Sequence, residues 1–343
     1  LSVSAVSSKL SRAPRPRRPI RNLEGPPGLE SSVEETGLES LEASLHSANA
    51  NMADLVRALE QGGRADVASI PTGALSWAVA RAVSEEPERR FAIVTPDLET
   101  ANRLEANLRF FLDAQAVSVF AAADTSPLLD VVPDRRAEML RMVSLRRLVE
   151  DNWTVLIVPA VALPRRVPPR QSIETRRLRI EFAQELDREA LVSRLLELGY
   201  LRVPLVEDMG TFSSRGAIVD VFPAGSEESP YRIELDDERV ERIRVFNPDD
   251  QKTGDELEHI ELGPAREIPD EPGRIAQAKR AVRALCDDMN MPTLKARELI
   301  DELDRGSGAL ISNALLPAYY DELGSLFDYI PTETHLLFFD PLH

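Results

Sequence analysis

A short stretch near residue 72 has the position of a phosphate-binding loop but lacks its residues. The apolar segment 68–70 leads into Thr72-Gly73, and a stretch with helical spacing follows. A working P-loop needs small residues for a tight turn, a lysine for the β- and γ-phosphates and a hydroxyl for magnesium. If this Thr-Gly pair is the middle of such a motif, Ser76 stands in the place of the lysine and Trp77 in the place of the hydroxyl. We therefore predict a degenerate P-loop, with the Trp77 side chain in the space of phosphate and metal.

The end of the chain has the shape of a Walker B segment. Residues 336–339 are an apolar run that leads to Asp340, and the next residue is Pro341, where an ATPase would place a water-activating glutamate. Together the two stretches favour a scaffold derived from an ATPase with both halves of its active site lost. The alternative is an ordinary α/β sheet with no nucleotide history. Both interpretations predict no ATP hydrolysis by this stretch and no bound cofactor.

The sequence contains no pattern typical of a disulfide, a metal site or a membrane span. Cys286 is the one cysteine, which excludes an internal disulfide and is typical of a reducing compartment, so we expect a cytoplasmic protein. The four histidines are scattered without ligand spacing, so we expect no metal site. No apolar run approaches the ~20 residues that a membrane helix needs, so we expect no membrane contact.

The charge is strongly acidic and unevenly distributed. A net charge of -17 argues against a surface that grips nucleic acid by neutralising phosphates, although a role through a protein partner stays open. Residues 1–22 hold six basic residues and no acidic one, in a stretch rich in Ser and Pro. We expect residues 1–51 to be a disordered extension. A transit-type leader or a basic tail is the alternative, and Met52 is a second candidate for the true start.

Hydrophobic periodicity after this extension predicts two kinds of domain. Residues 52–176 alternate buried strands with helices, which indicates a parallel sheet, and Thr95 and Pro96 are expected to open one of the helices. Residues 177–263 form a small α+β domain with short strands, in which Asp187 caps a helix that ends at Gly199. Residues 264–343 are helical and close with a strand that rejoins the first sheet. The strands are predicted at 91–94, 117–120, 155–158, 178–182, 201–206, 217–222, 231–235, 240–246 and 336–339, and the last two long helices at 275–289 and 294–303.

The small domain carries sequence blocks that resemble the UvrB-like module of transcription-repair coupling factors. The most specific block is TFSSRGAIVDVFP at 211–223 with PYRIE at 230–234. The resemblance extends from about residue 60 to 341. Further blocks lie at 124–127, 155–160, 163–167, 200–202, 243–246, 316–320 and 326–331. It implies a RecA-like parallel-sheet domain with a degenerate P-loop, into which a UvrB-interaction domain is inserted.

In this family the small domain binds UvrA through a polar surface with two arginines, which match Arg215 and Arg232 here. Arginine suits such an interface because its planar fork pairs with carboxylates in a bidentate way. We expect both to lie at strand starts, beside Gly216 and Tyr231, aimed outward. The alternative is that each arginine pairs locally with Glu234 or Asp237 in a solvated network.

The sequence departs from the family at one place in this surface. The resemblance implies two aromatic residues after the Arg-x-acid run, one of them in contact with UvrA, and Leu235 and Asp236 stand there instead. Such anchors contribute roughly 2 kcal/mol or more each to an interface. We therefore expect weaker binding of UvrA or a correspondingly changed partner surface.

The resemblance implies a monomeric, non-catalytic module that recruits UvrA to RNA polymerase stalled at a DNA lesion, in transcription-coupled nucleotide excision repair. Intact members add a polymerase-binding domain and an ATP-dependent DNA translocase, so RNA polymerase and DNA are expected partners of parts beyond this stretch. Family members also mask the UvrA-binding face until the translocase engages. Two other hypotheses stay open: a divergent UvrB-type DNA-dependent ATPase, and an acidic decoy that sequesters UvrA.

Overall fold

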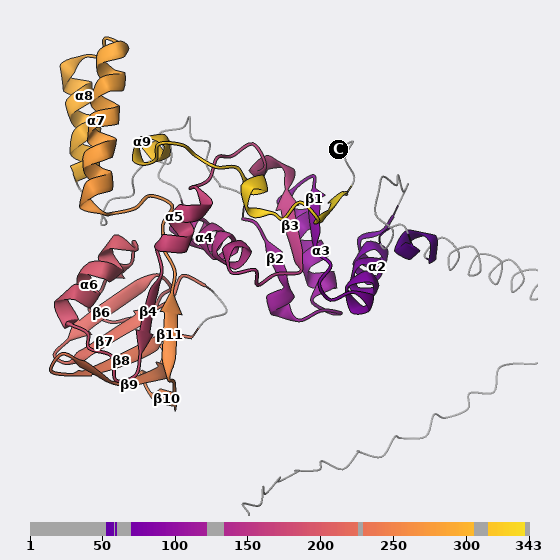
Figure 1. Cartoon of the computed structure of the whole chain (residues 1–343), viewed down its shortest axis with the longest axis horizontal. Coiled ribbons are helices and arrows are strands. Elements are labelled where there is room, and N and C mark those ends of the chain that lie inside the picture. The colour runs from indigo at the N-terminus through magenta and orange to yellow at the C-terminus, as the bar shows by residue number, and fades with distance from the viewer. Residues whose placement is uncertain are drawn as a thin grey trace, which may run out of the picture. The chain divides into compact units, whose positions relative to one another are not determined.

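The computed structural model describes residues 53–57, 59, 70–121, 134–225, 229–304 and 315–339, all within a unit that begins at Met52 (Figure 1). The predicted extension, 1–51, lies outside the described residues, and so do the Walker B-like Asp340 and Pro341. Among the helices that are described, none is both long and apolar enough to cross a bilayer.

The first sheet has four parallel strands in the order β12-β1-β3-β2. These are β1 (Phe91–Thr95), β2 (Val117–Val119), β3 (Val155–Pro159) and β12 (His335–Phe338). Every residue of β1 and β3 is buried, as expected for a parallel sheet covered on both faces. Strand β12 pairs with β1 from His335 to Phe338, which confirms the predicted return of the last strand to the first sheet.

Helices cover both faces of this sheet. On one face α2 (Thr72–Glu85) and α3 (Leu98–Leu108) place Val79 and Leu104 against Ile93 of β1 in a continuous core. On the other face α4 (Arg135–Val149) contributes to a second core that includes Leu156 of β3. The alternation of strand and helix inferred from the sequence therefore has its physical basis in two apolar layers around one sheet.

The start of α3 differs from the prediction. Thr95 is the last residue of β1, and the helix begins at Leu98 with Asp97 as its N-cap. The Asp97 carboxylate accepts a hydrogen bond from the Thr100 backbone N–H at 2.7 Å, which satisfies one of the free donors of the first turn and holds the pKa of Asp97 below its ordinary value. The prediction of Thr95 and Pro96 as the opening of this helix was wrong by two residues.

The small domain is built on a six-stranded sheet in the order β10-β9-β8-β7-β6-β5, with a separate two-stranded sheet, β11-β4 (Figure 1 labels most of these strands). Its strands are β4 (Leu178–Glu181), β5 (Leu201–Arg202), β6 (Thr211–Arg215), β7 (Ile218–Phe222), β8 (Tyr231–Asp236), β9 (Arg239–Phe246), β10 (Thr253–Glu256) and β11 (His259–Leu262). One face of the large sheet packs on α6 (Arg188–Glu197), which Asp187 caps as predicted. The predicted fold class, a parallel-sheet α/β domain with an inserted α+β domain, is confirmed; the exact domain boundaries stay a prediction.

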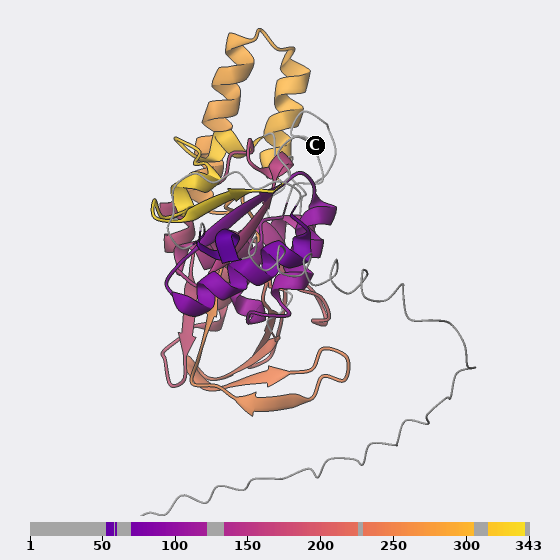
Figure 2. The same ribbon diagram turned by 90° about the vertical axis from the view of Figure 1, so that its right-hand side faces the viewer.

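After the small domain the chain is helical. Helices α7 (Pro272–Asp288) and α8 (Thr293–Asp304) pair along their length, as Figures 1 and 2 show, and share a core with α9 (Leu316–Tyr319). The described chain also includes α5 (Arg170–Thr175) and short 3-10 turns (Ala114–Ala116, Ala160–Ala162 and Leu326–Tyr329).

A buried charged cluster ties these parts together at Glu267, which lies after β11, the last strand of the small domain. The Glu267 carboxylate forms ion pairs with Arg141 of α4 at 2.5 Å and with Arg165 at 3.6 Å. Its backbone carbonyl accepts hydrogen bonds from Tyr320 Oη at 2.7 Å and from Arg176 Nη1 at 3.4 Å. Arg141 and Glu267 are both fully buried, so the pairing compensates charges that water cannot reach.

Helix α4 reaches the small domain from the same cluster. Its buried Glu138 accepts the Glu267 backbone N–H at 2.9 Å, and burial raises the pKa of Glu138. Arg135, one turn earlier, donates to the carbonyls of Gly199 and Gly210 at 3.2 and 2.7 Å. At Gly210, φ is +70° and the Met139 sulfur lies where a Cβ would point, so only glycine fits there.

Replacing Glu267 tests whether this cluster holds the fold. Glu267→Ala leaves Arg141 and Arg165 without their shared carboxylate, so we expect the free energy of unfolding to fall by about 3–5 kcal/mol. The exposed Glu322→Ala is the matched control and should change it by less than about 0.5 kcal/mol. Denaturant titration of both variants measures the difference; equal stabilities would show that the cluster contributes nothing.

Candidate functional site

The large sheet of the small domain has one apolar and one polar face. The register of strands β6 to β9 puts Ser213, Asp220, Arg232 and Arg244 side by side in one row. Because neighbouring residues of a strand point to opposite faces, the intervening Phe212, Val219, Val221, Ile233 and Ile243 lie in the core under α6. We call the polar side the Asp220 face, defined by Ser213, Arg215, Asp220, Arg232, Glu234, Arg242 and Arg244.

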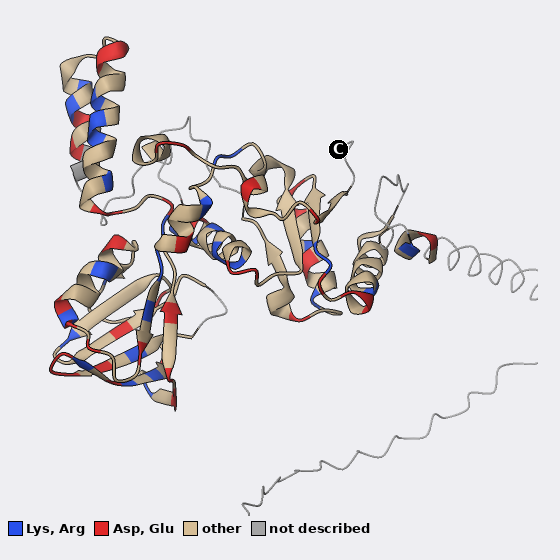
Figure 3. Ribbon diagram, viewed as in Figure 1, with Lys and Arg blue, Asp and Glu red and all other residues tan. Residues whose placement is uncertain are grey.

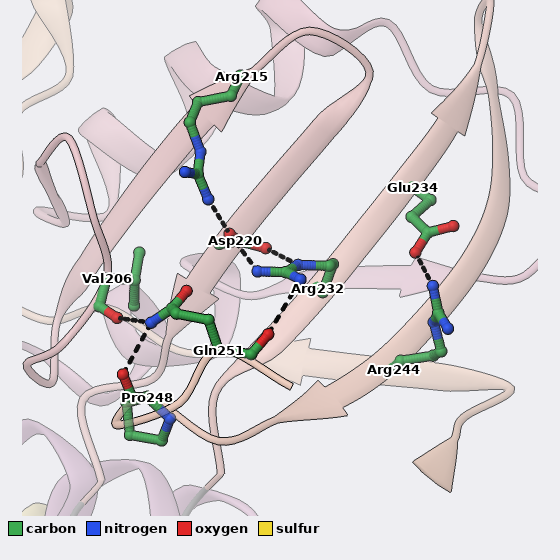
Figure 4. A network of polar contacts seen from close by, with 8 residues as sticks. All are labelled: Val206, Arg215, Asp220, Arg232, Glu234, Arg244, Pro248 and Gln251. Atoms are coloured by element: carbon green, nitrogen blue, oxygen red, sulfur yellow. Dashed lines mark hydrogen bonds and ion pairs between the residues drawn. The ribbon is translucent and has the colours of Figure 1, made fainter. Parts of the chain in front are cut away.

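Asp220 is the centre of this face and is completely buried. Figure 4 shows that two arginines converge on its carboxylate from the two neighbouring strands. Arg232 binds it in a bidentate way, with Nε on Oδ1 at 2.7 Å and Nη2 on Oδ2 at 3.0 Å, and Arg215 Nη2 also donates to Oδ2 at 3.0 Å. One buried negative charge is thus paired with two guanidinium groups, so the cluster carries a net positive charge.

The Arg232 guanidinium uses all three of its nitrogens in hydrogen bonds within the domain. Its remaining Nη1 donates to the Gln251 carbonyl at 3.3 Å, and its guanidinium lies 5.0 Å from the centre of the Phe246 ring. The hydrogen bonds to Asp220 raise the pKa of Arg232, and only 15% of its side chain is exposed. Gln251 is itself fixed, because its side-chain amide donates to the carbonyls of Val206 and Pro248 at 3.1 and 2.8 Å. Arg232 therefore acts mainly as a brace within the sheet.

Arg215 is placed very differently. It is the last residue of β6, immediately before the exposed turn at Gly216, where φ is +59°. Half of its side chain is exposed, at 52%, and within the described residues Asp220 is the one partner of its side chain that the structure gives. A guanidinium has five N–H donors, and the bond to Asp220 uses one of those of Arg215.

A second charged group lies on strands β8 and β9 of the same face. Glu234 is ion-paired with Arg244 and, at 3.9 Å, with Arg242 (Figure 4 shows the first pair). Figure 3 shows that basic and acidic residues both occur along the strands of the small domain. Because Glu234 is paired with β9, it does not pair with Arg215 or Arg232. The predicted alternative, local pairing with Glu234 or Asp237, was therefore wrong about the partner, which is Asp220.

The other predicted docking residues are not all on the surface. Gly216 and Asp236 are exposed at strand ends, whereas Tyr231 is half-buried on the core side of the sheet. Leu235 is only 4% exposed and lies in the core, because it shares its face with Ile233. Its prediction as a surface contact was wrong. Arg215 ends its strand rather than starting one, because β6, which the sequence patterns did not predict, precedes it.

The residues predicted as a degenerate P-loop lie in the first turns of α2. Ile70 is not in a strand, and 68–69 lie outside the described residues. Ser76 is fully buried and its hydroxyl donates to the Thr72 carbonyl at 2.8 Å. Trp77 is 43% exposed, and its place in the space of phosphate and metal stays a prediction. Gly73 lies in the first turn of α2, and a Cβ there would meet nothing within 4 Å, so no neighbouring group requires glycine.

Sequence reasoning missed the two residues that organise the Asp220 face. Asp220 carried a signal, because it is a lone charge in an otherwise apolar strand, IVDVF. Gln251 carried none, because its role depends on a positive φ of 60° and on contacts made across a turn. For metal chemistry, the described residues contain no group of three or more potential ligands.

Comparison with known proteins matches the small domain to a family. Residues 178–268 fit the model of the UvrB interaction domain. The chain is 36% identical over 245 residues to the transcription-repair-coupling factor of Myxococcus xanthus. The aligned region covers 69% of this chain and 20% of that protein.

Two further relatives bear the same name. The proteins of Escherichia coli and Bacillus subtilis are 30% and 28% identical, over 78% and 82% of this chain and 23% and 25% of their own lengths. The chain thus spans about a fifth to a quarter of the length of these relatives.

The two arginines of the Asp220 face should differ in their effect on stability. Arg232→Ala leaves the buried Asp220 carboxylate with one partner and uncovers Phe246, so we expect a loss of about 3 kcal/mol in the free energy of unfolding. Arg215→Ala removes a half-exposed side chain and should cost less than about 1 kcal/mol. Urea denaturation distinguishes them; equal losses would contradict the assignment of Arg232 as the brace.

Proposed function

We propose that this chain, a relative of the transcription-repair coupling factors, is a non-catalytic docking module that recruits UvrA through the Asp220 face of its UvrB interaction domain. The observation that carries the proposal is the convergence of Arg215 and Arg232 on one buried carboxylate. Both arginines match the family's UvrA-binding pair, and a single polar face of a rigid sheet holds them.

The charge of this face supports a protein partner. Its two acidic groups are paired within the sheet, since Asp220 is buried and Glu234 is bound to β9. The exposed groups are cationic, with Arg215 and Arg242 each about half exposed, at 52% and 48%. A surface that presents guanidinium groups fits a partner surface that presents carboxylates. The buried Leu235 leaves no aromatic anchor at that position, so polar contacts contribute a larger share of the affinity.

The non-catalytic part of the proposal rests on helix α2. A P-loop ATPase needs a lysine near the start of this helix, and the sequence of α2, TGALSWAVARAVSE, contains none. Its one cation, Arg81, is ion-paired with Glu85 in the last turn, and the Ser76 hydroxyl is bonded to the helix backbone. Within α2 there is therefore no lysine for the phosphates, and the Thr72 hydroxyl accepts a hydrogen bond from Asn107 Nδ2 at 3.3 Å.

In a complete coupling factor, domains other than this stretch would contact RNA polymerase and DNA. In that setting the Asp220 face would be covered in the resting protein and exposed when the translocase engages. Such a change is a shift between two populated states, in which UvrA competes with an internal partner for one surface. The module then acts as a monomeric adaptor.

Binding of purified UvrA tests the proposed role. We expect Arg215→Ala to weaken binding about thirtyfold, because a central interface arginine typically contributes about 2 kcal/mol or more. Arg179→Ala is a matched control: Arg179 is also 52% exposed and ion-paired, but lies on the β11-β4 sheet. Isothermal titration calorimetry measures both. If the two variants bind UvrA equally well, the Asp220 face is not the docking site.

ATP turnover tests the competing enzymatic role. We expect no hydrolysis above the buffer blank, with or without single-stranded DNA, because α2 supplies no lysine for the phosphates. A coupled assay of phosphate release measures it, and the variant Ser76→Ala serves as control because any residual rate should not depend on that hydroxyl. Turnover that DNA stimulates and Ser76→Ala abolishes would instead support a divergent ATPase.

A further inference from the structure

The structure gives the two arginines unequal roles that their sequence positions do not reveal. Arg232 uses Nε and Nη2 for Asp220 and Nη1 for the Gln251 carbonyl, and its flat surface faces Phe246. A partner could reach only the two remaining N–H donors of Arg232, on a side chain that is 15% exposed. Arg215 uses one donor, Nη2, and its side chain is half exposed.

We propose that Asp220 is a positioning residue that holds Arg215 by one edge, so that Arg215 alone presents a preformed fork to a carboxylate of the partner while Arg232 only braces Asp220. This inference deepens the proposed docking function and rests on it. Arg215 makes the contact with UvrA. The buried carboxylate of Asp220 sets the orientation of Arg215 and does not itself touch UvrA.

The physical reason is the entropy of a long side chain. A free surface arginine loses up to about 2 kcal/mol of rotamer freedom when a partner fixes it. Here that ordering has occurred before binding, because Nη2 is anchored to an oxygen that the Arg232 bidentate pair keeps in place. The cluster stays cationic even with Asp220 ionised, since two guanidinium groups share one carboxylate. An acidic partner group therefore meets an oriented positive charge.

Arginine is required for this arrangement. The planar guanidinium can bond Asp220 at one edge and a second carboxylate at another, whereas a lysine ammonium is a single point charge. Arg215 also lies at the end of β6, before the exposed turn at Gly216, where a partner can approach it. The same argument explains why the half-exposed Arg242, whose ion pair with Glu234 spans 3.9 Å, is a weaker candidate for a fixed contact.

A double-mutant cycle on UvrA affinity tests the proposal. Asp220→Asn keeps the shape of the side chain but removes its charge, and should weaken UvrA binding about tenfold in the otherwise unchanged chain. In the Arg215→Ala background the same change should alter binding less than about twofold, because there is no longer an arginine to position. A purely structural role of Asp220 would weaken binding equally in both backgrounds, and that result would overturn the proposal.

A second variant covers the case in which Asp220→Asn fails to fold. Arg215→Lys keeps the charge at an exposed site, and we expect it to bind UvrA about tenfold more weakly than the unchanged chain, with its Tm unaltered. Affinity equal to that of the unchanged chain would overturn the proposal. Absence of UvrA binding by the unchanged chain itself would instead remove the docking function on which the inference rests.

Discussion

The carboxylate of Asp220 has no exposed surface, and a buried charge is tolerated only where partners compensate it. Arg232 supplies a bidentate pair and Arg215 a third hydrogen bond, so three strands of the sheet meet at one ionised group. This constraint fixes the orientation of both guanidinium groups and explains why the polar face is ordered although it is largely hydrophilic. Docking through this face depends on that constraint, because without Asp220 the Arg215 and Arg232 side chains would lose the carboxylate they share.

A second buried charge fixes the small domain to the rest of the unit. Glu267 is paired with Arg141 of α4, and α4 also reaches the domain through Arg135 and the glycine at 210. The two clusters have different roles. The one at Glu267 joins segments that are far apart in the chain, whereas the one at Asp220 orients groups toward solvent. A docking face on a firmly held domain loses little freedom when a partner binds, which favours affinity for a given number of contacts.

Much of the fold followed from the sequence, because apolar periodicity reports burial directly. The strands at 91–94 and 155–158, the cap at Asp187 and the return of the last strand were predictable for this reason. Strand β6 was not, because its TFSSR sequence is polar at the end that faces solvent. The two arginines came from a family resemblance, and the pattern of residues alone could not say which acid pairs with them. Cross-strand pairing at Asp220 depends on a register that only the three-dimensional structure supplies.

Hydrogen–deuterium exchange with and without UvrA would show whether UvrA binds at the Asp220 face. We expect UvrA to slow exchange in the turn after Arg215 and along β8 and β9, and to leave the start of α2 unchanged even when ATP is added. Slowed exchange confined to α2 and α3, with the Asp220 face unaffected, would contradict binding at that face.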